Sequence, residues 1–169
     1  MSIFEEQISR KPDHYPWTEE FITAMHNGFW TDKEFNFQSD LQDFKVTLTD
    51  PERDMVTRSL SAIGQIEVAV KTFWAKVGEN LPHPSITDLG YVMANIEVIH
   101  NNAYERLLGV LGMEEVFEQN LQLDIIQNRV KYLRKYLKKR YKDANKQYVY
   151  SLVLFTLYVE NVSLFSQFY

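Results

Sequence analysis

The chain contains one short motif whose residue types and spacing suit metal binding. Glu97 and His100 are three residues apart, and Tyr104 follows the histidine by four. On a helix, which turns 100° per residue, the three side chains lie within about 60° of one another. A carboxylate oxygen and an imidazole nitrogen placed in this way can reach the same metal ion. The motif alone is equally compatible with an exposed glutamate beside a core histidine and a core tyrosine.

Two further glutamates favour the metal interpretation. Glu67 belongs to the apolar stripe of the preceding predicted helix, and Glu160 lies within the most apolar stretch of the chain. A carboxylate buried without a partner costs several kcal/mol or takes up a proton, so buried carboxylates are usually paired or bound to metal. Oxygen ligands with one histidine suit iron or manganese. We expect Glu67, Glu97, His100 and Glu160 to converge on one site, the alternative being glutamates that are separately exposed or protonated.

Helices must position these residues, because apolar side chains recur at steps of three and four along the chain. We expect an irregular arm over residues 1–17, a loop over 31–48, and helices over about 18–30, 50–78, 85–111, 121–142 and 145–169. The pattern indicates no β-hairpin and no internal repeat. The sequence therefore predicts a single all-α domain with long helices and short connections.

Local signals mark several helix ends. Capped helix starts are expected at three places: Thr18, Thr49 with Glu52, and Ser85 with Asp88. Gly109 and Gly112 are expected to end the helix that carries the Glu97 motif. His14, His26 and His83 fall in loops or at helix ends and receive no role.

Composition excludes several classes of protein. The 169 residues are 45% hydrophobic and 24% charged, which is typical of one globular domain. The lack of cysteine is compatible with the reducing cytoplasm, where we expect the protein to lie. The absence of cysteine excludes zinc fingers and thiol nucleophiles. The net charge of -5 argues against nucleic acid or an anionic membrane as partner. The basic residues between Arg129 and Lys146 are therefore interpreted as a solvated helix face. The apolar stretch of residues 148–159 is shorter than the roughly 20 residues of a membrane span.

Four stretches of the sequence resemble the small, radical-generating subunit of class I ribonucleotide reductase. They are Phe29–Trp30 before an acidic loop, residues 59–67, residues 96–104 and residues 159–168. In this family a first carboxylate precedes the Glu-x-x-His motif by about thirty residues, and a tyrosine follows the histidine by four. Both spacings hold here, and the four stretches extend over nearly the whole chain.

The resemblance implies a ferritin-like helical bundle that holds a dinuclear centre of iron, manganese or both. It also implies a role for each matching residue: Glu67, Glu97, His100 and Glu160 as metal ligands, Tyr104 as the radical, Trp30 as the first electron carrier, and Leu164 with Phe168 as apolar wall. The centre would react with dioxygen. The oxidising equivalent would then pass from this subunit to the large subunit, where ribonucleotides lose their 2′-hydroxyl. The implied partners are that large subunit and a second copy of this chain.

The chain departs from the family pattern in two respects. It has Glu67 where most members have Asp, and Glu97–His100 is its only Glu-x-x-His pair, whereas the family has a second pair on a later helix. We therefore expect the C-terminal half of the bundle to be supplied by further chain or by a separate polypeptide. Two other functions remain open on the residues alone: a ferritin-like di-metal oxidase or ferroxidase, and a non-catalytic helical protein that binds partners.

Overall fold

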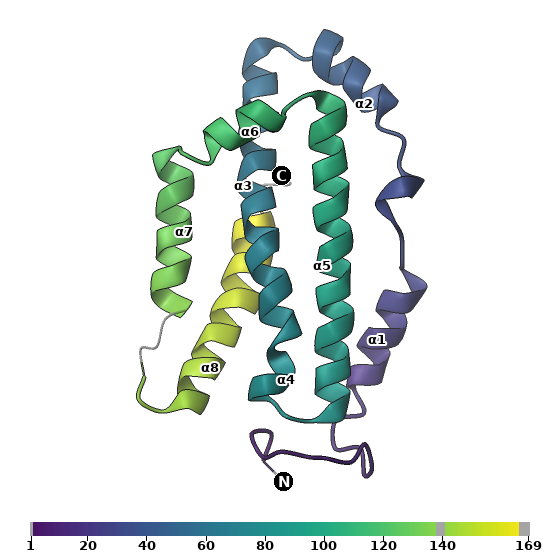
Figure 1. Ribbon diagram of the computed structural model, residues 1–169, viewed down its shortest axis with the longest axis vertical. Coiled ribbons are helices and arrows are strands. Elements are labelled where there is room, and N and C mark those ends of the chain that lie inside the picture. Colours follow the sequence, from purple (N-terminus) through teal and green to yellow (C-terminus); the bar gives the residue numbers. More distant parts are fainter. Residues whose placement is uncertain (1, 138–140, 166–169) are drawn as a thin grey trace. The chain divides into compact units, whose positions relative to one another are not determined.

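The computed structural model describes residues 2–137 and 141–165, and the side chains of 65–69, 133–137 and 163 are outside that description. Every regular element of the described residues is a helix, as predicted (Figure 1). In chain order the elements are α1 (Thr18–Asn27), η1 (Asp32–Glu34), α2 (Gln38–Gln42), η2 (Asp43–Thr47), α3 (Asp50–Ala75), α4 (Val77–Asn80), α5 (Pro84–Leu111), α6 (Glu114–Asn120), α7 (Asp124–Leu137), α8 (Ala144–Val153) and η3 (Leu154–Leu164). Here η1 is a 3-10 turn, whereas η2 and η3 are π-helices.

The chain folds into two compact units, each assembled from two stretches of sequence. The first unit contains residues 1–35 and 67–103, and the second contains residues 36–66 and 104–169. The long helices α3 and α5 each contribute one part to each unit. Over the described residues, no helix combines the length and the apolar character that crossing a membrane requires.

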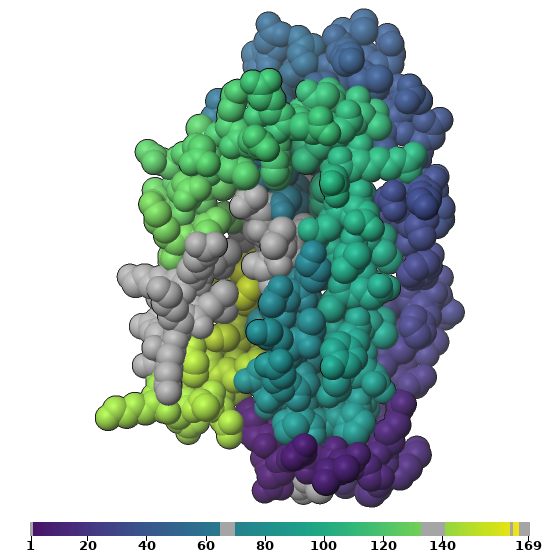
Figure 2. Space-filling view, in the orientation of Figure 1, coloured from purple at the N-terminus to yellow at the C-terminus, as the bar shows by residue number. Residues whose placement is uncertain are grey.

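The first unit is packed tightly around the start of α5. A Cβ atom added at Gly90 would lie 2.1 Å from Val77 Cγ1 and 2.7 Å from the carbonyl oxygen of Trp74. Only glycine therefore allows α5 to approach the end of α3 and the short helix α4 so closely. The N-terminal arm covers the connection between α4 and α5 (Figures 1 and 2), where the amide of Gln7 donates to the carbonyl of Pro82 at 2.9 Å.

The second unit has its own apolar core where α5 ends. Leu108, Leu111 and Met113 are buried there against five partly buried side chains, namely Leu41, Phe44, Leu60, Leu107 and Phe117. Gly112 ends α5 with a φ of 70°, the left-handed conformation that favours glycine, as its position in the sequence predicted. This core explains why the segment after α5 turns back as α6.

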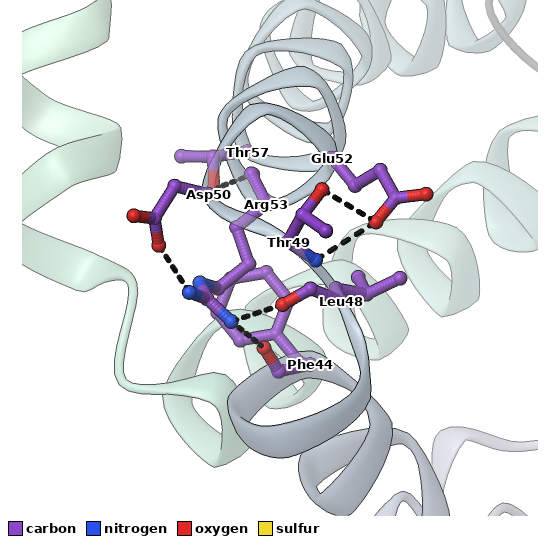
Figure 3. A network of polar contacts seen from close by, with 7 residues as sticks. All are labelled: Phe44, Leu48, Thr49, Asp50, Glu52, Arg53 and Thr57. Carbon is purple, nitrogen blue, oxygen red and sulfur yellow. Dashed lines mark hydrogen bonds and ion pairs between the residues drawn. The ribbon is translucent and has the colours of Figure 1, made fainter.

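A polar network fixes the start of α3 (Figure 3). The backbone amide and hydroxyl of Thr49 donate to Glu52 Oε2 at 2.8 and 2.7 Å, and these hydrogen bonds hold the pKa of Glu52 below its usual value. Arg53 donates to the carbonyls of Leu48 and Phe44 and pairs with Asp50. The predicted capping residues Thr49 and Glu52 are confirmed, because their bonds are local to one turn.

The other two predicted caps were wrong. Thr18 begins α1 without a side-chain cap, and its hydroxyl donates to the carbonyl of Tyr15 at 3.0 Å. α5 begins at Pro84, one residue before the predicted Ser85. The side chains of Ser85 and Asp88 bind the N-terminal arm instead, through Asp13 and Arg10.

The sequence also missed short helices and one change of helix type. The stretch predicted as a loop over 31–48 contains η1, α2 and η2. The capping box of Thr31 and Glu34 closes η1, and Leu41 of α2 and Phe44 of η2 pack into the second core. The last helix was expected to be α-helical to residue 169, but it becomes a π-helix at Leu154. Residues 166–169 lie outside the described part of the chain. Where the sequence is apolar on nearly all sides of a helix, it has no hydrophobic periodicity that could distinguish an α-helix from a π-helix.

Candidate metal and electron-transfer site

Helix α5 places the Glu97 and His100 side chains against each other, as their spacing predicted. His100 Nδ1 lies 3.0 Å from Glu97 Oε2, and the two side chains are 35% and 12% exposed. The Nδ2 amide of Asn101 donates to the carbonyl of Glu97 at 2.7 Å, which adds a second contact within the same turn. A mostly shielded carboxylate therefore faces an imidazole nitrogen that remains partly open to solvent.

The ring of Trp30 stacks on the imidazole of His100. The two ring centroids are 5.8 Å apart and the planes are inclined by 28°. Trp30 lies between α1 and η1, and the turn η1 is held by a capping box of Thr31 and Glu34. The stack joins two residues that are far apart in sequence, so sequence spacing could not have predicted it. Trp30, His100 and Glu97 form one contiguous cluster within the first unit.

The remaining predicted site residues are placed less completely. The side chain of Glu67 and all of Phe168 lie outside the described residues. Tyr104 is half-buried on α5, one turn after His100, and Leu164 is half-buried at the end of η3. Glu160 is also half-buried on η3, with its Oε1 atom fully buried.

The convergence of all four predicted ligands stays a prediction. Glu97 and His100 belong to the first unit, whereas Glu160 belongs to the second. Among the side chains that the structure describes, no three of the types His, Asp and Glu are grouped so that they could hold a metal ion. Glu67, the nearest predicted ligand in chain order, is not among those side chains.

The donor chemistry of the described pair fits a metal such as iron or manganese. Glu97 offers a carboxylate oxygen and His100 an imidazole nitrogen, the types that such metals accept in helical bundles. The two atoms already face each other across one hydrogen bond, so a cation that replaces the shared proton would meet both donors. Low exposure of the carboxylate favours either a partner or a bound cation.

His83 has a structural role that sequence reasoning missed. Its side chain is fully buried, its Nδ1 lies 3.1 Å from Gln7 Oε1, and its Nε2 lies 3.3 Å from the carbonyl oxygen of Ser2. The ring of Tyr15 meets it edge-on at 4.7 Å. The only sequence signal was its place at the start of a helix between Pro82 and Pro84, which does not reveal partners in a distant arm.

The basic segment Arg129–Lys146, predicted to be a solvated face, is not wholly solvated among its described side chains, and those of 133–140 lie outside the description. Burial lowers the pKa of Arg129, and burial raises the pKa of Tyr148 to about 12. Arg129 lines a cavity of about 530 Å³ in the second unit, together with Tyr132, Tyr150, Val153, Leu154, Tyr158 and Val159. The Lys131, Lys142 and Lys146 side chains are exposed, in agreement with the prediction for them.

The fold belongs to the ferritin-like, all-α class that ribonucleotide reductase small subunits adopt. A crystal structure described as that of a "putative class I ribonucleotide reductase from Bacillus halodurans" superposes on 81% of this chain with a TM-score of 0.73 and 24% sequence identity. The superposition covers 50% of that chain.

The family follows from sequence comparison. The family model described as "Ribonucleotide reductase, small chain" matches residues 7–169, so the chain belongs to the ribonucleotide reductase small-chain family. A protein named as a probable ribonucleoside-diphosphate reductase small subunit, from Invertebrate iridescent virus 6, is 26% identical over 99% of this chain and 50% of its own. The ribonucleoside-diphosphate reductase subunit beta of Halalkalibacterium halodurans is 24% identical over 70% of this chain and 35% of its own. The chain thus spans half or less of the length of these curated relatives.

Proposed function

We propose that this chain acts in the small subunit of a ribonucleoside-diphosphate reductase, where it helps to generate the oxidising equivalent used by the large subunit. Membership of the family supports this function. The observation that carries it is the cluster of Glu97, His100 and Trp30, in which two metal-ligand donors and an aromatic ring are in contact. The substrate class is ribonucleoside diphosphates, as in the names of the curated relatives.

Glu97 and His100 would hold one metal of a dinuclear centre of iron, manganese or both, with Glu67 and Glu160 as further ligands. Such a centre, when bound at these residues, would supply the oxidising equivalent by chemistry with dioxygen. Glu97 would contribute negative charge that offsets the charge of the metal, and in the metal-free chain its contact with Nδ1 already orients the imidazole of His100. Because the curated relatives are about twice as long, the remaining ligands belong to the part of the family fold that these residues do not span.

Tyr104 and Trp30 would move the oxidising equivalent. Tyr104 is half-buried and precedes the buried Leu108 by one turn, so its phenol is partly shielded from water. A shielded phenol is suited to hold a stable radical, which is the role proposed for it. Trp30 contacts His100 through its ring and provides a route away from the metal ligands toward the large subunit. The proposal also includes a homodimer in the cytoplasm.

The assignment can be tested by metal titration of the purified chain without oxygen. Mn(II) binding, followed by the loss of the free-ion electron paramagnetic resonance signal, should weaken at least about tenfold in Glu97→Gln and in His100→Ala. The matched control is Glu105→Gln, which removes an exposed carboxylate from the same helix. Equal affinity in the wild-type chain and both site variants would contradict the proposed ligands.

A further inference from the structure

We propose that Phe35 is a positioning residue that holds the indole of Trp30 parallel to the imidazole of His100. The Phe35 ring meets Trp30 edge-on, with centroids 5.0 Å apart and planes at 88°. Trp30 in turn lies almost parallel to His100. Trp30 therefore has two aromatic neighbours, Phe35 in an edge-on contact and His100 in a stacked contact. The geometry stands independently, whereas its consequence for electron transfer rests on the proposed function.

The turn η1 explains how Phe35 reaches Trp30. The amide and hydroxyl of Thr31 donate to Glu34 Oε1 at 2.8 and 3.2 Å, and the amide of Glu34 donates to the carbonyl of Thr31 at 3.1 Å. These bonds close one 3-10 turn directly after Trp30, and Phe35 is the residue that ends it. The turn thus returns the chain so that the side chains on either side of it meet.

The exposure of Phe35 indicates that burial of apolar area is not its main contribution. Its side chain is 45% exposed, although a phenylalanine is among the residues most often buried in a core. The perpendicular contact with Trp30 is a preferred arrangement of two aromatic rings, because the positive edge of one ring meets the negative face of the other. Such a contact restricts tilting of the indole about its own side-chain bonds.

The proposed consequence is that Phe35 acts on electron transfer only through Trp30. Loss of the edge-on contact frees the indole to tilt, and a tilted indole no longer lies face to face with His100. Tyrosine at position 35 keeps the ring and its edge, whereas leucine keeps apolar volume but has no ring. Phe35→Tyr and Phe35→Leu therefore separate an aromatic positioning role from simple space filling.

The test is nuclear magnetic resonance of the metal-free 169-residue chain at one fixed pH. The observables are the nuclear Overhauser effects between the Trp30 and His100 rings and the ring-current shift of the His100 ring protons, with Trp30→Phe as assignment standard. Phe35→Leu should lose most of the Overhauser intensity, and Phe35→Tyr should retain it. Phe21→Leu is the matched control, because Phe21 is also an exposed phenylalanine, at 56% against 45% for Phe35, and its ring contacts Trp17.

Circular dichroism and thermal unfolding of each variant separate a loss of fold from a loss of ring positioning. Retention of the wild-type Overhauser effects and shifts in folded Phe35→Leu would overturn the proposal. So would their loss in folded Phe35→Tyr. Neither measurement involves metal or the large subunit, so a failure of the proposed function in the metal titration leaves this result intact, and the reverse also holds.

Discussion

Two histidines, His83 directly before α5 and His100 within α5, differ in what surrounds them. His83 is fully buried, and both of its ring nitrogens face neutral oxygen atoms, Oε1 of Gln7 and the carbonyl of Ser2. His100 is about one-third exposed, with a carboxylate at Nδ1 and an indole against its face. The imidazole is thus enclosed by polar contacts at position 83, whereas at position 100 it remains partly open to solvent.

Burial of the ring and the charge of the group facing it distinguish the structural histidine, His83, from the candidate metal ligand, His100. The orientation of the Gln7 amide is fixed, because its Nε2 donates to the carbonyls of Ser9 and Pro12 at 2.6 and 2.8 Å. The amide oxygen of Gln7, Oε1, is therefore the atom that faces His83. His83 links the N-terminal arm to α5, and a metal could not reach its ring without breaking that link. The side chain of His100, in contrast, is about one-third exposed.

The largest expected effect is at His83. His83→Ala removes a buried ring together with its polar contacts to Gln7 and Ser2, which should lower the free energy of unfolding by roughly 3 kcal/mol. Denaturant unfolding measures the change. His26→Ala is the matched control, since His26 is exposed on α1, and it should change stability by less than about 0.5 kcal/mol. A similar loss in both variants would remove the contrast between buried and open histidines.

A smaller effect is expected from glycines of the same helix. Gly90→Ala would place a methyl group against Val77 and the Trp74 carbonyl, so we expect a loss of about 2 kcal/mol. Gly109→Ala faces open space apart from Glu114 at 3.5 Å and should gain about 0.5–1 kcal/mol of helix stability. Thermal unfolding of both variants reports the two signs. If Gly90→Ala is neutral, the start of α5 is less tightly packed than described.

The smallest effect on stability is expected at His100. In the metal-free chain, His100→Ala removes one hydrogen bond and one partly exposed ring contact, at a cost of about 1 kcal/mol. Denaturant unfolding beside His83→Ala gives the comparison directly. If His100→Ala proves as costly as His83→Ala, His100 is a structural residue and the division between the two is wrong.

Local features of this fold could be predicted from the sequence, and contacts between distant segments could not. The placement of Glu97 and His100 on one face of a helix and the cap of Thr49 with Glu52 could be predicted, because one helical turn determines each geometry. The cap at Ser85 was wrong because the distant residue Asp13 accepts from its hydroxyl instead.

The same reason explains what was missed at the site. The stacking of Trp30 on His100 depends on how the segment after α1 returns to α5, which no spacing in the sequence encodes. The partners of His83 lie in an arm without periodicity. The convergence of Glu67 and Glu160 with His100 stays a prediction, because the Glu67 side chain is outside the described residues.

The central claim, that His100 is a metal ligand, is tested most directly by electron spin echo envelope modulation of the Mn(II)-loaded chain. We predict modulation from a directly bound imidazole nitrogen in the wild-type protein and in His26→Ala, and its loss in His100→Ala. Isotopic replacement of histidine nitrogen by 15N should change the modulation pattern in the first two samples. Absence of nitrogen modulation from the wild-type chain, or its persistence in His100→Ala, would contradict the account.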